Sequence, residues 1–320
     1  MTILFTHPDC VAHNPGPGHP ERPERLKAVL AALDHPDFAA LDRREAPLAT
    51  VEQIGRVHGA GFVASLLGSV PNHGFARVDA DTVMSPGSGR AALRAAGAVI
   101  AAVDAVVKPQ VAGAMAGSAT AFCAVRPPGH HAEPGQAMGF CLFNSVAVGA
   151  AHAEVAHGLK RIAIVDFDVH HGNGTQTMTA ARDGWLYAST HQHPFYPGTG
   201  SARELGQYGN IVNAPLSSGD GGTEFRAAFE GLILPALDNY EPELLMISAG
   251  FDAHYRDPLA SIELDEADFA WATEALADVA RRHASGRIVS VLEGGYDLDA
   301  LASSAAAHVR ALMAAERFSA

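Results

Sequence analysis

Cysteine is scarce in this chain, which has Cys10, Cys123 and Cys141 in 320 residues. These three stand far apart, so they form neither a Cys-x-x-Cys pair nor an even-numbered disulfide framework. We therefore expect free thiols in a reducing compartment and predict a cytoplasmic protein. The first residues, MTILFTHPDC, have no basic stretch followed by a long apolar run. This pattern predicts that the chain carries no signal peptide.

Long apolar runs and excess positive charge are also missing. The apolar run at 95–103 lies between Arg94 and Asp104. It is far shorter than the ~20 residues of a membrane span, so we predict no membrane contact. Lysine and arginine number 22 against 35 aspartates and glutamates, a net charge of −13. This balance opposes a phosphate-binding surface, so we expect no nucleic-acid partner.

Apolar residues make up 48% of the sequence and charged residues 18%, which predicts a large core. Helical patterns alternate with short apolar runs along the whole length, so we predict one α/β domain over 1–320 with a mainly parallel sheet. The helical patterns cover 24–33, 89–107, 268–283 and 298–315. The predicted strands cover 121–125, 161–166, 185–190, 243–249 and 287–292.

The informative polar residues follow directly after these strands. The segments are RPPGHH, DFDVHHGNG, HQHPFYPGTG, GFDAH and EGGYD. The strands are short and mostly apolar, as expected for parallel strands that are buried on both faces. Open α/β sheets place their ligand sites at the carboxyl ends of their strands. We therefore expect one functional site that is assembled from these segments.

A metal site is the first prediction from these segments. Asp166, Asp168 and His170 alternate along one strand end and share a side. Asp252 follows another strand, so Asp168, His170 and Asp252 form a one-histidine, two-carboxylate set. Three ligands leave a position open for water and substrate, as in catalytic sites. Single aspartates at strand ends are usually caps or turn formers, but the unit DxDxHH favours metal binding.

An acid–base pair is the second prediction. His130 and His131 stand in a loop that two prolines and a glycine stiffen. Amide hydrolysis needs a base for water and an acid for the departing amine, which a fixed histidine pair supplies. The alternative is a solvent-exposed pair in a turn. Tyr296 follows Gly294 and Gly295, whose backbone can approach the site closely, and its phenol could stabilise an oxyanion or simply pack in the turn.

Three aromatic residues, Phe140, Phe195 and Tyr196, stand in loops that are rich in glycine and proline. They lack the spacing of a helix face. They either form the walls of a narrow apolar channel or anchor their loops, and the residue pattern gives both interpretations equal weight.

Taken together, the motifs resemble the histone deacetylase superfamily, which includes acetylpolyamine amidohydrolases and acetoin-utilisation proteins. The resemblance runs from His7 to Tyr296. It implies an arginase-like, three-layer α/β fold around a central, mainly parallel sheet of about eight strands. The blocks that carry it are HNPGPGHPERPERL, DADTVMSPGS, RPPGHHA, MGFCLFN, VDFDVHHGNGT, FYPGTG, SAGFDAH and EGGY, in the family's order.

The resemblance also implies residue roles. One catalytic Zn²⁺ per chain would bind the Asp168, His170 and Asp252 set, and a structural K⁺ would lie nearby. His130 would act as the base with Asp166 behind it, His131 would be the second histidine, and Tyr296 would polarise the acyl carbonyl. Asp81 would orient the substrate backbone. The other implied channel residues are Gly139, Phe140, Tyr196 and Leu259, and the implied potassium residues are Asp166, Asp168, His170, Ser189 and Thr190.

The sequence departs from parts of the family. Asn173 stands where class I enzymes have an aspartate beside the second histidine, and class II-like members carry asparagine there. Without that neighbouring charge, we do not expect His131 to be held as an imidazolium. Leu259 stands where a polyamine-selective relative has an acidic gatekeeper. The segment 113–120 lacks the acidic insertion of acetylpolyamine amidohydrolases. The last two features weaken the acetylpolyamine interpretation, so we expect N-acetyl-lysine-type substrates.

Several alternatives remain open at this point. An acetylpolyamine amidohydrolase would use the same machinery on another acylated amine. A ureohydrolase would need two metal ions and more ligands than the sequence offers. A pseudoenzyme would keep the fold as a small-molecule binding module, although each catalytic position holds a competent residue. A homo-oligomer is compatible with all of them.

Overall fold

The computed structural model describes residues 1–107 and 119–316. Within them, eight parallel strands form one sheet in the order β2-β1-β5-β10-β9-β6-β7-β8. The segment 113–120 lies mostly outside the described residues. The strands are β1 (Ile3–Thr6), β2 (Asp42–Glu45), β5 (Thr120–Cys123), β6 (Ile162–Asp166), β7 (Trp185–Gln192), β8 (Ile211–Leu216), β9 (Leu244–Ala249) and β10 (Ile288–Leu292); β3 (Ala76–Arg77) and β4 (Val83–Met84) form a separate antiparallel pair.

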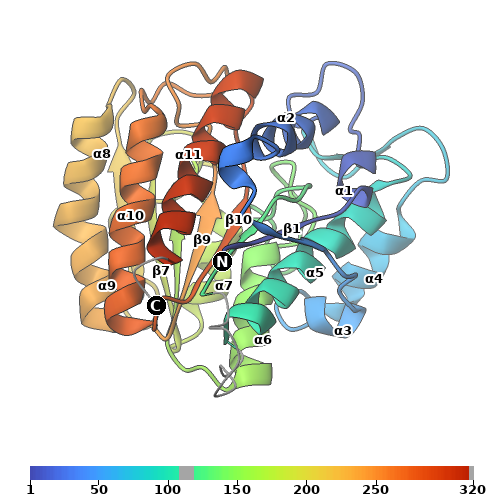
Figure 1. Cartoon of the computed structure of the whole chain (residues 1–320). Coiled ribbons are helices and arrows are strands. Elements are labelled where there is room, and N and C mark those ends of the chain that lie inside the picture. Colours follow the sequence, from blue (N-terminus) through green and yellow to red (C-terminus); the bar gives the residue numbers. More distant parts are fainter. Residues whose placement is uncertain (108–118, 317–320) are drawn as a thin grey trace.

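Helices cover both faces of the sheet (Figure 1). Helices α10 and α11 pack together on one face, with α2 against α11, whereas α5 and α6 pack together on the other. The helices are α1 (Asp9–Ala12), α2 (Pro23–Leu33), η1 (Pro36–Phe38), α3 (Val51–Ile54), α4 (Ala60–Gly68), α5 (Ser88–Val107), α6 (Ser145–His157), α7 (Asn173–Ala180), α8 (Gly222–Ala228), η2 (Phe229–Ile233), α9 (Leu234–Tyr240), α10 (Glu266–His283) and α11 (Leu298–Glu316). The predicted three-layer α/β fold with a parallel sheet is confirmed.

The local sequence explains where the predicted helices begin. Helix α2 starts at Pro23, whose fixed backbone suits a first helical position. Helix α10 starts two residues before the predicted 268, because Asp265 caps it. The Asp265 carboxylate accepts the N–H groups of Ala267 and Asp268 at 2.8 and 3.3 Å. These bonds satisfy donors that have no partner inside the helix.

The order of the strands positions the functional site. Strands β5, β10, β9, β6 and β7 are consecutive neighbours in the middle of the sheet. These are the five strands that the sequence predicted, and all of their residues are buried. Parallel neighbours end on the same edge, so the five polar segments that follow them meet there. No helix in 1–107 or 119–316 is long and apolar enough to cross a membrane.

Candidate active site

The three predicted metal ligands meet where β6 and β9 end. Asp168 and His170 follow β6, and Asp252 follows β9. His170 Nδ1 lies 3.2 Å from Asp168 Oδ1 and 3.1 Å from Asp252 Oδ2. The possible ligand atoms of the three residues lie within 4.8 Å of one another, and all three residues are buried. The structure therefore assembles the predicted one-histidine, two-carboxylate set.

A bound cation would stabilise the buried negative charges of this cluster. Burial raises the pKa of Asp252, and the neighbouring charge of Asp168 raises it further. Burial opposes protonation of His170, but the two carboxylates outweigh it and raise its pKa to about 10. Buried carboxylates are unfavourable unless a positive charge compensates them. The donor set thus fits a divalent ion that accepts oxygen and imidazole ligands, such as Zn²⁺.

Two glycines allow the carboxylates to approach the backbone. A Cβ atom on Gly294 would lie 2.1 Å from Asp252 Oδ2, and one on Gly250 would lie 2.1 Å from Asp168 Oδ2. The Gly294 N–H also donates to Asp168 Oδ2 at 2.8 Å. A larger residue at either position would push a metal ligand out of place, so these glycines are needed for close approach.

His130 is held by a buried hydrogen-bond network. Its Nδ1 lies 3.0 Å from Asp166 Oδ2, and its Nε2 lies 3.8 Å from Asp168 Oδ2. Tyr187 donates its phenol hydrogen to the same Asp166 oxygen at 3.1 Å. Burial opposes a charged imidazole, but Asp168 and Asp166 outweigh it and raise the pKa of His130 well above its ordinary value. His130 is therefore suited to take up a proton at Nε2.

His131 lies beside His130, with 4.0 Å between the ring centroids, in a different electrostatic setting. Its Nδ1 is 2.8 Å from Asn173 Oδ1, and Asn173 Nδ2 donates to Glu133 Oε1 at 2.7 Å. Burial lowers the pKa of His131 well below its ordinary value, and the charges of His130 and His170 lower it further. A neutral amide partner offsets little of this, so His131 is neutral when His130 is charged.

Tyr296 is buried and is fixed through its backbone. Its N–H donates to Asp257 Oδ2 at 2.7 Å, and Asp257 Oδ1 accepts the Leu259 N–H at 3.0 Å. The Arg25 guanidinium lies 4.8 Å from the centre of the Tyr296 ring. Burial raises the pKa of Tyr296 well above its ordinary value, so the phenol stays protonated and remains a donor.

A cavity of about 180 Å³ leads to these groups. Phe140 meets Tyr296 edge to face with 5.9 Å between centroids, and Phe195 stacks on His170 at 5.6 Å. The lining is mainly apolar, which fits the channel interpretation of the loop aromatics. The residues that line the cavity are Asp81, His131, Gly139, Phe140, His170, Phe195, Tyr196, Leu259 and Tyr296.

The remaining predicted residues are not among those that line this cavity. The Gly295 carbonyl accepts a hydrogen bond from Arg25 Nε at 2.5 Å, behind Tyr296. Ser189 pairs with Asp166 in the register between β6 and β7, and Thr190 is the next residue of β7. Both are buried beside the metal ligands' strand. The five residues assigned to potassium thus come from two adjacent strand ends.

Three residues near the site had no role in the sequence predictions. Tyr187 lies inside β7, where its hydroxyl among the apolar residues at the start of the strand was the available indication. Glu293 follows β10 and accepts the N–H groups of Gly129 and His130 at 2.6 and 3.2 Å. Burial raises the pKa of Glu293 to about 7. Asp257 accepts the Tyr296 N–H across 39 residues of sequence, so no local pattern indicated this contact.

Comparisons with known proteins show the family of this chain. The family model described as "Histone deacetylase domain" matches residues 19–312. Histone deacetylase 14, chloroplastic, of Arabidopsis thaliana is 36% identical over 97% of this chain and 76% of its own length. The histone deacetylase-like amidohydrolase of Pseudomonas aeruginosa is 40% identical over 87% of this chain and 73% of its own length.

A solved structure, that of the HDA15 HD domain, superposes with a TM-score of 0.90 at 34% identity, over 98% of this chain and 88% of that one. This match confirms the arginase-like form of the α/β fold. The family match also confirms the prediction of an enzyme that hydrolyses acetylated amides. By sequence and fold, the chain belongs to the histone deacetylase family.

Proposed function

We propose that this protein is a Zn²⁺-dependent deacetylase that acts on amides of the N-acetyl-lysine type. One observation carries the proposal. The buried Asp168, His170 and Asp252 cluster adjoins a mainly apolar cavity that His131, His170 and Tyr296 also line. The apolar walls of the cavity suit the methylene stem of an acyl-lysine, and the polar side chains of His131, His170 and Tyr296 are suited to contact its amide group.

Asp168, His170 and Asp252 would hold the ion, which supplies Lewis acidity toward the carbonyl and toward a water molecule. His130 Nε2 would take the proton of that water, because Asp166 behind Nδ1 stabilises the resulting imidazolium. The Tyr187 hydroxyl keeps the Asp166 carboxylate oriented toward His130. The chain thus provides a base whose proton affinity is set by buried charges.

Two further side chains would act on the substrate itself. The Tyr296 phenol would donate a hydrogen bond to the acyl oxygen as its negative charge grows. His131, held by Asn173 and lining the cavity, would face the departing amine and supply or relay its proton. The buried setting of both donors strengthens their hydrogen bonds, because water does not compete for the same oxygen and nitrogen atoms.

Asp81 would orient the substrate at the cavity. Its Oδ1 accepts the Gly139 N–H at 3.2 Å and the Thr82 hydroxyl at 2.9 Å, so the carboxylate is fixed in direction. Because Asp81 lines the cavity, this carboxylate would accept a backbone N–H of a peptide substrate. We further propose a structural K⁺ at Asp166, Asp168, His170, Ser189 and Thr190, supported by their position on adjacent strand ends.

A cytoplasmic location is also part of the proposal. The three cysteines are free and buried, so none forms a disulfide in the fold. The fold therefore does not require an oxidising compartment. A homo-oligomer and the absence of a nucleic-acid partner stay predictions from the sequence.

Steady-state turnover of a fluorogenic acetyl-lysine peptide, before and after removal of metal by a chelator, tests the function. We expect turnover that the chelator abolishes and added Zn²⁺ restores. Turnover that survives complete metal removal would contradict the metal-dependent mechanism. No hydrolysis of any acetylated amine by the metal-loaded protein would favour the binding-module alternative.

A further inference from the structure

A second cluster of metal-binding side chains lies away from the active site. It consists of Asp104 near the end of α5 and His152 and His157 in the last turns of α6. The other end of α6 reaches the catalytic loop, where Asn144 Nδ2 donates to Thr175 Oγ1 beside the His130 backbone. Thirteen helical residues span about 18 Å, so the cluster is separate from the active site.

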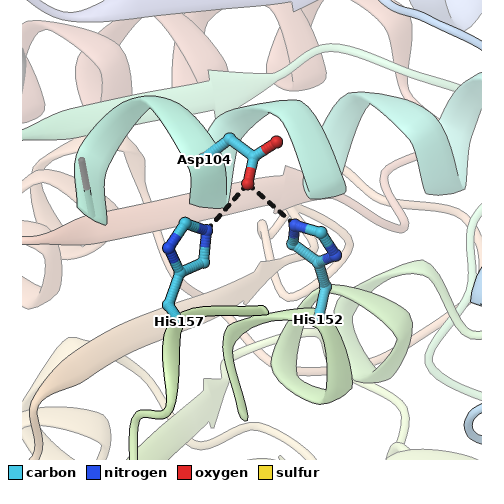
Figure 2. Close-up of side chains that lie close together, drawn as sticks. All are labelled: Asp104, His152 and His157. Carbon is cyan, nitrogen blue, oxygen red and sulfur yellow. Dashed lines mark hydrogen bonds and ion pairs between the residues drawn. The ribbon is translucent and has the colours of Figure 1, made fainter. Parts of the chain in front are cut away.

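Figure 2 shows the Asp104 carboxylate pointing between the two imidazoles. Asp104 Oδ1 lies 2.8 Å from His152 Nε2 and 2.7 Å from His157 Nε2. The imidazole planes are inclined at 78° to each other with 5.6 Å between their centroids. The side chains are 38%, 9% and 17% exposed for Asp104, His152 and His157. The cluster is thus partly shielded but reachable from solvent.

We propose that Asp104, His152 and His157 bind a second divalent ion of the Zn²⁺ class, which links α5 to α6. Both imidazoles direct Nε2 at one carboxylate oxygen, so one ion can contact all three residues after a small outward shift of the side chains. Two imidazoles and a carboxylate suit Zn²⁺, Ni²⁺ or Cu²⁺ better than Mg²⁺ or Ca²⁺, which prefer oxygen ligands. Water would complete the coordination on the exposed side.

Arg56 contacts the ring nitrogen of His152 that faces away from Asp104. Its Nη1 lies 3.0 Å from His152 Nδ1. An imidazole that binds metal through Nε2 carries its hydrogen on Nδ1, where it would face the guanidinium donor. Arg56 must therefore turn aside when the ion binds. A glutamine at this position could instead accept the Nδ1 hydrogen through its side-chain oxygen, as outer partners of metal-bound histidines do.

The test is a calorimetric titration of the purified full chain with Zn²⁺ at neutral pH, with metal content measured in parallel. We expect one more equivalent in the wild type than in His157→Ala or His152→Ala. These variants should keep wild-type turnover on acetylated amides, because the cluster is remote from the active site. His283→Ala is the matched control, since His283 lies 2.9 Å from Asp238 without a second histidine on that carboxylate, and it should bind as the wild type does.

Arg56→Gln keeps all three ligands and should bind the extra equivalent about tenfold more tightly. Equal stoichiometry in the wild type and both histidine variants would overturn the proposal and leave the cluster as a hydrogen-bonded link between helices. A second equivalent that persists in a His152→Ala, His157→Ala double variant would overturn it as well. Because the readout is a difference between variants, it does not depend on what the catalytic centre holds.

Discussion

Side-chain partners decide the roles of individual residues in this site. His130 and His131 are adjacent in sequence, yet one faces the carboxylate of Asp166 and the other the amide of Asn173. The first is therefore suited to hold a proton and the second to remain neutral. The sequence indicated this difference through Asn173. It did not indicate Tyr187 or Asp257, whose contacts depend on strands and loops that are far apart in sequence.

Tyr296→Phe removes the proposed oxyanion donor and leaves its ring in place. We expect the catalytic constant on an acetyl-lysine peptide to fall ~10²–10³-fold, as is typical for one lost donor. Metal content and melting temperature should stay at wild-type values. Turnover close to that of the wild type would show that Tyr296 does not stabilise the transition state.

Asp257→Asn tests whether Asp257 positions Tyr296. The carboxylate accepts the Tyr296 and Leu259 N–H groups through different oxygens, and the amide can keep only one of these bonds. We expect a ~10–10²-fold loss in the catalytic constant from the displaced phenol, with little change in KM. In a Tyr296→Phe background the same substitution should have almost no further effect. Additive losses in the double variant would refute a role through Tyr296.

We expect the choice of substrate to depend on Leu259. This apolar residue lines the cavity where an acidic gatekeeper would pair with the internal ammonium of a polyamine. We expect acetyl-lysine peptides to exceed N8-acetylspermidine in kcat/KM by up to ~10²-fold, because a buried cation without a partner is unfavourable. Leu259→Glu should narrow this ratio. A wild-type preference for the acetylpolyamine would overturn the substrate assignment and leave the hydrolase assignment unchanged.

At the scale of elements, the five central strands were predictable, whereas β1, β2 and β8 were not. The five central strands follow the apolar runs of the sequence closely. Strand β2 was missed because its sequence, DRRE, is charged and three of its four residues are exposed on the edge of the sheet. Strand β8 was missed because it contains Pro215, and proline is uncommon inside a strand. Helix α6 was missed because it is buried around most of its circumference and therefore lacks an amphipathic pattern.

A buried ion-pair cluster joins the segment before α2 to the loop after β5. Glu21 contacts Arg25 Nη1 at 2.9 Å and Arg126 Nη2 at 2.6 Å, and all three side chains are fully buried. Burial alone would raise the pKa of Glu21, but Arg126, His13 and Arg25 outweigh it and hold that pKa well below its ordinary value. Ionised Glu21 therefore stabilises the fold.

Glu21→Gln should lower the free energy of unfolding at neutral pH by about 3 kcal/mol or more, because two buried guanidinium groups lose their counter-charge. The folded-state pKa is depressed, so this contribution is complete above the unfolded-state pKa of ~4.3 and disappears as pH falls through the folded-state value. Denaturant titrations of both proteins at a series of pH values measure the difference. If the difference in free energy of unfolding between the wild type and Glu21→Gln stayed constant as the pH falls, ionised Glu21 would not be the source of the stabilisation.

At the scale of the whole molecule, the two proposed clusters of metal ligands lie toward opposite ends of helix α6. The catalytic groups gather at the carboxyl ends of its central strands, and the Asp104 cluster lies at the far end of α6. The catalytic set was predictable because its residues sit in short motifs after recognisable strands. The Asp104 cluster was not, since His152 and His157 show no motif and meet Asp104 only through the packing of α5 on α6.

The most direct test of the proposed mechanism is acetate release from an acetyl-lysine peptide by metal-free protein to which Zn²⁺ is returned. The wild type should be inactive without metal and regain full turnover as its catalytic site fills. Asp252→Ala should fold, bind less Zn²⁺ than the wild type and remain inactive, because one of the three ligands is missing. Wild-type turnover by Asp252→Ala, or by the metal-free protein, would contradict the proposal that this cluster holds the catalytic ion.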